Sequence, residues 1–169
     1  KLAAGRFDRT GYNQELKGAV CAVIGFGGNG KAIARAMQAM GMTVFGINRS
    51  GNTDAPIEFI GKASDLGKAL EMADVVVVTT PLNRETRDLI GKNELERMKA
   101  DAILINVGRG EVINQRALYD HLKSRPAFRA GIDTWWSEPA DRGRLALEYP
   151  FFELPNIIGS PHCADHVPD

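Results

Sequence analysis

The stretch VIGFGGNGKAIARAM, residues 23–37, joins an apolar run to a helical pattern through a glycine-rich loop. Its glycines Gly25, Gly27 and Gly30 fit G-x-G-x-x-G, a pattern too common to identify a site on its own. The apolar run that leads into it, residues 19–25, is typical of a parallel strand buried on both faces. A strand, a glycine loop and a helix in this order predict the first unit of a parallel α/β sheet.

The helix predicted after the loop spans residues 29–41. Its apolar residues Ile33, Met37 and Met40 fall on one stripe, which we expect to pack against the sheet. Gly41 is the expected end of the helix, because glycine readily adopts the left-handed conformation found at helix C-termini.

The rest of the chain alternates in the same way between apolar runs and helical segments. Further strands are expected at residues 43–48, 73–80, 101–107, 129–133 and 156–160. Helical segments are expected at residues 64–72, 92–98 and 113–124. Right-handed crossovers between parallel strands place helices over the sheet. The sequence therefore predicts an α/β fold: a doubly wound parallel sheet of the Rossmann type, with helices on both faces.

Charge and composition exclude several classes of partner. The 169 residues include 21 Lys and Arg and 21 Asp and Glu, so the formal net charge is zero and no overall field attracts nucleic acid or a membrane surface. No apolar run approaches the roughly 20 residues of a membrane span, and the polar start has no signal-peptide pattern. The two cysteines, Cys21 and Cys163, form no metal-binding pair. We therefore expect no metal, no nucleic-acid or membrane partner, and a cytoplasmic location.

Ligands of such a sheet bind beyond the carboxyl ends of its strands. Small, polar or charged residues follow each of the expected strands there: residues 25–30, 48–50, 79–81, 108–110 and 160–162, together with Asp133. This clustering raises the glycine pattern above background and predicts one binding edge.

The glycine loop at this edge has the strand and helix context that a dinucleotide site requires. Gly25 would allow the tight turn, Gly27 the approach of a pyrophosphate, and Gly30 the close packing of helix on sheet. The N–H groups of Gly28 and Asn29 would then face the phosphates. The alternative is a glycine-rich turn with a close helix–strand contact and no ligand.

The end of the second expected strand bears on the choice of nucleotide. Domains that bind NAD usually place Asp or Glu about 20 residues beyond the loop, where it accepts hydrogen bonds from the adenosine ribose. This chain has Asn48, followed by Arg49 and Ser50. Arg49 could pair with a 2′-phosphate and Ser50 could donate to it, so we expect NADP to be preferred over NAD. The alternative is a solvated Arg49, with Asn48 bound to an unmodified ribose.

If the dinucleotide carries a nicotinamide, the expected chemistry is hydride transfer to a carbonyl. That reaction needs a proton donor, a cation that holds the substrate and a group that adjusts the pKa of the donor. The strand ends supply candidates for each: Arg109 in NVGRGEVIN, Glu138 in GIDTWWSEP and His162 in LPNIIGSPH.

Together these segments resemble the D-isomer-specific 2-hydroxyacid dehydrogenases, a family that includes glyoxylate/hydroxypyruvate reductases, phosphoglycerate dehydrogenases and D-lactate dehydrogenases. The resemblance runs from about Leu16 to His162. Its segments occur in the family's order: ELKGAVCAVIGFGGNGKAIA, ADVVVVTTPLNRETRDLIGKNELERMKADAILINVGRGEVINQRALYDHL, AGIDTWWSEP and PFFELPNIIGSPH.

The resemblance implies a catalytic role for three residues. Arg109 matches the arginine that binds the substrate carboxylate and polarises the carbonyl. His162 matches the proton donor in reduction and acceptor in oxidation, and Glu138 matches the acid that orients the histidine ring. Formate dehydrogenases have Gln at the position of Glu138, which argues against that activity.

The resemblance also implies contacts to the cofactor. Asp133 would meet the nicotinamide carboxamide, and Arg109 and His162 would border the same ring. The remaining positions are Thr80, Pro81 and Thr86 on the adenine side, and Val107, Gly108 and Ala164 near the nicotinamide.

The resemblance sets the expected domain organisation. Residues 1–18 would be an arm or linker, residues 19–162 the dinucleotide-binding domain, and residues 163–169 the start of a truncated C-terminal tail. The family's substrate-binding domain is absent from this chain, so we expect nucleotide binding with little or no turnover. The family also implies a 2-oxoacid substrate and a homodimer formed through the cofactor domain.

Two kinds of function remain open on the sequence. One is the hydride-transferring enzyme, and the other is a nucleotide-sensing regulator built on the same domain, since fold alone does not decide function. Trp135 and Trp136 could shape the substrate mouth, or pack in the core or a dimer contact. His121 lies in a predicted amphipathic helix, where we expect a structural role.

Overall fold

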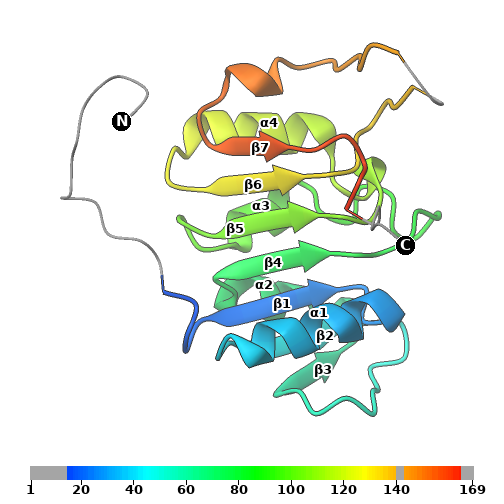
Figure 1. The fold of residues 1–169 in the computed structure, drawn as a ribbon, viewed down its shortest axis with the longest axis vertical. Coiled ribbons are helices and arrows are strands. Elements are labelled where there is room, and N and C mark those ends of the chain that lie inside the picture. Colours follow the sequence, from blue (N-terminus) through cyan, green and yellow to red (C-terminus); the bar gives the residue numbers. More distant parts are fainter. Residues whose placement is uncertain (1–14, 140–142, 165–169) are drawn as a thin grey trace.

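The computed structural model describes residues 15–139 and 143–164 (Figure 1). They contain a seven-stranded sheet in the order β3-β2-β1-β4-β5-β6-β7, and every pairing is parallel. The strands are β1 (Val20–Ile24), β2 (Thr43–Ile47), β3 (Phe59–Gly61), β4 (Val75–Val78), β5 (Ile103–Asn106), β6 (Arg129–Ile132) and β7 (Ile157–Gly159). The strand order reverses direction beside β1, as in doubly wound folds. The predicted fold class is confirmed.

Four α-helices and three short 3₁₀ turns connect the described strands. The helices are α1 (Gly28–Ala39), α2 (Leu66–Met72), α3 (Lys92–Arg97) and α4 (Gln115–Ser124). The 3₁₀ turns are η2 (Ala63–Asp65), η3 (Gly110–Val112) and η4 (Phe151–Glu153). In Figure 1, α1 lies in front of the sheet and α2, α3 and α4 lie behind it, so helices cover both faces as expected. None of the helices in the described ranges is long and apolar enough to cross a membrane.

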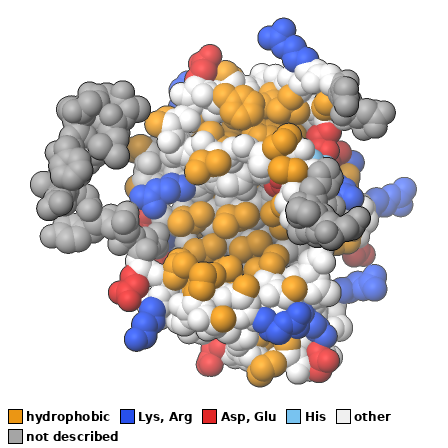
Figure 2. All heavy atoms as spheres, viewed as in Figure 1, with side chains coloured by type: hydrophobic (Ala, Val, Ile, Leu, Met, Phe, Trp, Pro, Cys, Tyr) orange, Lys and Arg blue, Asp and Glu red, His pale blue; other side chains and the backbone are white. Residues whose placement is uncertain are grey.

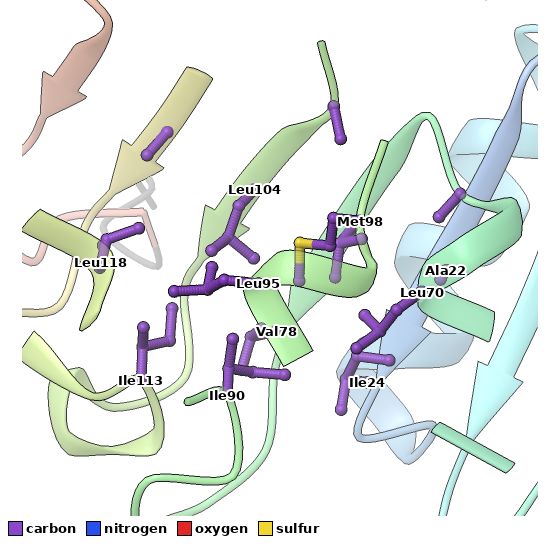
Figure 3. Close-up of a cluster of buried hydrophobic side chains, with 14 of the residues drawn as sticks. Ala22, Ile24, Leu70, Val78, Ile90, Leu95, Met98, Leu104, Ile113 and Leu118 are labelled. Carbon is purple, nitrogen blue, oxygen red and sulfur yellow. The ribbon is translucent and has the colours of Figure 1, made fainter. Parts of the chain in front are cut away.

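The larger core lies between the sheet and helices α2 to α4. Figure 3 shows how side chains of the strands meet those of the helices and loops in this layer. Leu104 of β5, Leu95 of α3 and Leu118 of α4 are all fully buried. At about 25 cal/mol per Å² of apolar surface, burial of this layer is the main force that holds the helices on the sheet.

The smaller core lies between the sheet and α1. Cys21 and Val23 of β1 are inaccessible to solvent, and Ala34 of α1 packs on them. Of the expected helical stripe, Ile33 and Met37 do pack against this cluster, but the inclusion of Met40 was wrong. Met40 is 43% exposed because the helix ends there, one residue before Gly41 adopts a φ of +81°.

Helix α1 covers only part of its face of the sheet. Figure 2 shows hydrophobic side chains gathered across the middle of this face. Ile103 and Ile105 of β5 are only partly buried there. At the β7 edge of the sheet, Ile158 is 80% and Phe152 65% exposed.

The observed boundaries are shorter than the expected ones. The strand expected at residues 73–80 spans Val75–Val78, and the helix expected at residues 113–124 begins at Gln115 after an Asn114 cap. Strand β3 and the 3₁₀ turns were not expected. The expected arm lies outside the described residues up to residue 14, and the expected tail lies outside them after Ala164.

Candidate active site

The residues that follow the strands lie in one row along an edge of the sheet. After most strands, the next peptide N–H donates to the last carbonyl of a neighbouring strand. These hydrogen bonds are Gly25 N to Ile47 O at 2.9 Å, Thr79 N to Ile24 O at 2.8 Å, Val107 N to Val78 O at 3.0 Å, Asp133 N to Asn106 O at 3.0 Å and Ser160 N to Ile132 O at 3.0 Å. The expected clustering of these residues at the carboxyl edge is therefore confirmed.

The glycine loop has the geometry of a phosphate cradle. Gly25 has a φ of +101°, and a Cβ there would lie 2.8 Å from the Thr80 nitrogen. A Cβ on Gly30 would lie 2.6 Å from the Gly25 oxygen, so α1 packs directly on the loop. By contrast, a Cβ on Gly27 or Gly28 would meet nothing within 4 Å.

The first turn of α1 also suits an anion. Gly27 is its N-cap and supplies no side-chain cap, and the first turn holds no acidic residue. The N–H groups of Gly28 and Asn29 are thus left for a ligand, at the positive end of the helix dipole. The open space at Gly27 and the uncapped amides fit the pyrophosphate of a dinucleotide.

The end of β2 forms a compact polar turn. The Oδ1 atom of Asn48 accepts hydrogen bonds from Gly51 N at 2.7 Å and Ser50 Oγ at 3.1 Å, while its amide donates to Asn52 O at 2.9 Å. Arg49 is exposed, and within the described part of the chain it has no hydrogen-bond or ion-pair partner. The Asn48 amide also donates to Phe26 O in the glycine loop at 3.4 Å, so its donors are used by the protein, and the cation beside it without a partner among the described residues is Arg49.

The positions expected on the adenine side lie in the loop after β4. Thr80 is buried and its hydroxyl donates to Ile24 O at 2.9 Å. Thr86 donates to Pro81 O at 2.6 Å and accepts from Asn83 N at 2.8 Å. These bonds fix the shape of the loop, and neither hydroxyl points freely toward a ligand.

Asn106, the last residue of β5, holds the loop that carries Arg109 through hydrogen bonds to the loop backbone. The fully buried Asn106 side chain donates to Arg109 O at 3.0 Å and accepts from Gly108 N at 3.0 Å. Gly108 lies close to the loop after β4, since a Cβ there would be 2.7 Å from Thr80 O. The exposed Arg109 guanidinium donates to Gly108 O at 2.7 Å and has no carboxylate partner in the described part of the chain.

Glu138 and His162 form a direct pair, although 24 residues separate them in sequence. The Nδ1 atom of His162 lies 2.7 Å from Glu138 Oε2, and the other carboxylate oxygen accepts from Trp135 N at 2.6 Å. Because a carboxylate can only accept, Nδ1 carries the proton and Nε2 is left as the ring's second functional atom. Both side chains are about one-third exposed, at 31% and 36%.

Asp133 holds the segment that carries His162. Its Oδ1 accepts from Ser160 Oγ at 2.6 Å and Cys163 N at 3.0 Å, and its Oδ2 accepts from Ala164 N at 3.1 Å. Burial alone would raise the pKa of Asp133, but these hydrogen bonds and the nearby His162 outweigh it and hold the pKa below its usual value. His162 itself has a positive φ of 51°, an uncommon conformation that this anchoring maintains.

Trp135 and Trp136, whose roles the sequence left open, both pack against other parts of the domain. Trp135 is 5% exposed and its indole N–H donates to Ser160 O at 2.8 Å. Trp136 stacks on Phe151 and donates to Ile113 O at 2.6 Å. Both tryptophans therefore pack inside the domain.

His121 is buried in α4, with its ring edge-on to Phe128 at 4.6 Å between centroids. Its Nε2 has no hydrogen-bond partner among the described residues. Burial lowers the pKa of His121 to about 4, and the charge of Arg125 acts in the same direction. This agrees with the structural role expected from the sequence.

Sequence reasoning predicted Arg109, Glu138 and His162 as one site, but it did not predict the hydrogen bonds of Asn106 and Ser160 that hold their segments. Asn106 and Ser160 were visible only as parts of the segments around Arg109 and His162. A polar residue at the end of a buried strand was the available signal for Asn106. Within residues 15–139 and 143–164, no group of three His, Cys, Asp or Glu side chains could hold a metal ion.

Comparison with protein families shows to which family this chain belongs. The family described as "D-isomer specific 2-hydroxyacid dehydrogenase, NAD binding domain" matches residues 1–164. The chain belongs to this family. It is thus an NAD-binding domain of the D-2-hydroxyacid dehydrogenases, and the expected resemblance is confirmed.

Individual relatives agree with this family. The chain is 35% identical over 148 residues to a glyoxylate reductase of Thermococcus gammatolerans, which covers 88% of this chain and 42% of the relative. It is 33% identical over 159 residues to glyoxylate/hydroxypyruvate reductase B of Pectobacterium carotovorum, with 94% of this chain and 48% of the relative covered. These names give no support to a non-enzymatic regulator.

A solved dehydrogenase structure shows the same fold. The D-lactate dehydrogenase of Lactobacillus jensenii, solved with NAD⁺, superposes with a TM-score of 0.82 at 29% identity. The match covers 96% of this chain and 51% of that structure. This D-2-hydroxyacid dehydrogenase domain therefore spans about half the length of the relatives it matches.

Proposed function

We propose that this domain is the cofactor-binding half of an enzyme that transfers a hydride between NAD(P)H and a small 2-oxoacid, giving a D-2-hydroxyacid. The observation that carries the proposal is the pair formed by His162 Nδ1 and Glu138 Oε2, 2.7 Å apart at the carboxyl edge of the sheet. A dinucleotide laid along that edge from the glycine loop has its reactive ring at the other end of the same row of strand ends.

The three catalytic candidates have complementary tasks. His162 donates a proton to the carbonyl oxygen from Nε2, because Glu138 holds the Nδ1 side of the ring. Arg109 binds the substrate carboxylate in bidentate fashion and draws electron density from the carbonyl. The bound nicotinamide supplies the hydride, and the chain's residues orient the substrate and supply the proton.

The cofactor positions follow from the cradle. Gly25, Gly27 and Gly30 shape the loop, and the amides of Gly28 and Asn29 bind the pyrophosphate. The backbone around Thr80, Pro81 and Thr86 lines the adenine side. Val107, Gly108, Asp133 and Ala164 line the nicotinamide side, where Asp133 acts chiefly through the loop that it anchors.

We further propose that NADPH is the preferred reductant. The end of β2 has no carboxylate to repel a 2′-phosphate, and the exposed guanidinium of Arg49 can pair with one. A reductase that uses NADPH would act mainly on 2-oxoacids such as glyoxylate and hydroxypyruvate.

The assembly proposed for the enzyme is a homodimer formed through this domain, in the cytoplasm. The partly covered sheet face and the exposed residues near β7 leave apolar surface that a partner would bury.

The test uses the full-length protein with a panel of 2-oxoacids and both reduced cofactors. We expect turnover of a small 2-oxoacid, with a higher kcat/KM for NADPH than for NADH. His162→Asn should lower kcat by about 100- to 10,000-fold, since general acid catalysis contributes on this scale, while cofactor binding by fluorescence stays unchanged. Wild-type protein that binds cofactor but reduces no 2-oxoacid in the panel would contradict the proposal.

A further inference from the structure

The segments of the three catalytic candidates meet at one buried residue, Trp135. Its peptide N–H donates to Glu138 Oε1 at 2.6 Å, and thereby fixes the carboxylate whose other oxygen faces His162. Its indole N–H donates to Ser160 O at 2.8 Å, two residues before His162. Glu138 is thus bound to the backbone of Trp135, and the segment that carries His162 is bound to the side chain of Trp135.

The packing around Trp135 leaves its ring little freedom. A Cβ on Gly159 would overlap the indole ring, so the β7 backbone lies directly against it. The ring also contacts Phe152, with centroids 5.2 Å apart. On the other side, a Cβ on Gly110 would overlap the Trp135 main chain, so the residue after Arg109 packs there too.

We propose that Trp135 is a positioning residue: its indole N–H fixes the Ser160–His162 segment relative to Glu138 and so sets the geometry of the catalytic pair. This inference rests on the proposed function for its kinetic consequence. It adds a side chain that does not touch the substrate but determines where the proton donor lies.

The hydrogen bond from the Trp135 indole holds a segment, residues 160–162, whose histidine has little packing of its own. His162 has a φ of 51°, and its side chain is 36% exposed, so few packing contacts hold the ring itself. Asp133 fixes the segment through Ser160 Oγ and the amides after His162. Trp135, three residues before Glu138 in the same stretch of chain, adds a further side-chain hydrogen bond, from its indole to Ser160 O at 2.8 Å.

Trp135→Phe is the variant that isolates this hydrogen bond, since it keeps an aromatic ring and removes the N–H donor. Trp136→Phe is the matched control: it removes a similar hydrogen bond, to Ile113 O at 2.6 Å, but none to the His162 segment. Circular dichroism and thermal melting of both variants establish that they fold.

The first readout is independent of turnover. In the wild-type chain, the Nδ1 proton shared with Glu138 should give a far-downfield proton NMR signal, assigned by its loss in His162→Asn. We expect this signal to broaden or disappear in Trp135→Phe and to persist in Trp136→Phe. The second readout is kinetic: in the full-length enzyme, Trp135→Phe should lower kcat about tenfold, with KM changed less than about twofold.

The outcomes separate the two proposals. If Trp135→Phe keeps both the signal and kcat, or if Trp136→Phe loses them equally, the positioning role is wrong. If the signal depends on Trp135 while the wild-type enzyme reduces no 2-oxoacid, the proposed function fails and the positioning role stands. Should Trp135→Phe not fold, 3-benzothienylalanine at position 135 keeps the shape of the indole without its N–H, and the same readouts apply.

Discussion

Gly30 shows how one missing side chain positions the cofactor half of the site. A Cβ at this position would lie 2.6 Å from Gly25 O and 3.2 Å from Val23 Cγ1, so only glycine lets α1 begin this close to β1. The spacing of the glycines was enough to predict this contact, because the last glycine of the pattern occurs where a helix packs too closely on a strand for a Cβ.

Asn48 shows the opposite situation. Its position at the end of β2 was predicted, but its hydrogen bonds to Gly51 and Ser50 were not. Side-chain bonds within a turn depend on local backbone conformation, and several polar residues in sequence offer many possible pairings. The sequence could therefore indicate which residue types follow β2 but not which of their polar atoms remain free to bind a ligand.

Arg49→Ala tests the proposed cofactor preference at this position. Loss of a charge-assisted hydrogen bond to a 2′-phosphate should lower kcat/KM for NADPH about tenfold and leave that for NADH nearly unchanged. Arg35→Ala, which removes an exposed arginine from α1, is the control for a general loss of positive charge. Equal effects on both cofactors would show that Arg49 does not recognise the phosphate.

At the scale of elements, segments with an apolar run or stripe were predictable, even the three-residue β7, whereas β3 and the 3₁₀ turns were not. The apolar run of β4 and the apolar stripe of α4 gave clear signals, since both bury several residues against the same core. Strand β3 has only three residues, Phe59–Gly61, and its pairing with β2 is a tertiary contact without a period of its own. The turn η3 begins at Gly110, which packs directly on the Trp135 main chain, a tertiary contact that no local pattern shows.

Helix α4 carries a pH-dependent contribution to stability through His121. The pKa of His121 is lowered from 6.5 to about 4 in the folded chain, so the unfolded chain binds a proton more readily as pH falls through this window. The folded state is therefore destabilised on acidification, by about 2 kcal/mol between pH 7 and pH 5. Glu96 opposes this shift and Arg125 adds to it.

The measurement is urea unfolding at both pH values. His121→Leu should remove this contribution, and it removes a buried Nε2 that has no hydrogen-bond partner among the described residues. We expect the drop in unfolding free energy from pH 7 to pH 5 to be smaller in the variant by about 2 kcal/mol. An identical drop in both proteins would mean that His121 is not buried in its neutral form.

At the scale of the whole molecule, the chain combines a glycine loop with an uncapped helix start and a His162–Glu138 pair, while it spans about half the length of its relatives, 42% and 48% in the two reductases. In the enzyme that we propose, these 169 residues taken alone would leave the substrate in contact with water, which would weaken the electrostatic effect of Arg109. Binding and catalysis should therefore separate in this chain.

Thermal unfolding of the 169-residue chain with and without NADPH tests that separation. A ligand at 100 times its Kd adds about 2.7 kcal/mol of stability, which corresponds to a rise in Tm of about 5–10 °C for a domain of this size. We expect that rise together with negligible oxidation of NADPH by glyoxylate. Turnover by the chain at the rate of the full-length enzyme would show that no further domain is needed.

The burial of Cys21 makes the rate of its alkylation a measure of how often the sheet opens. Its thiol lies under α1 with no exposed surface, and burial raises its pKa to about 12, so almost no thiolate is present to react at neutral pH. Alkylation of Cys21 must wait until β1 separates from its cover, whereas the partly exposed Cys163 can be labelled directly. The ratio of the two alkylation rates, read by mass spectrometry, would report how often the sheet opens.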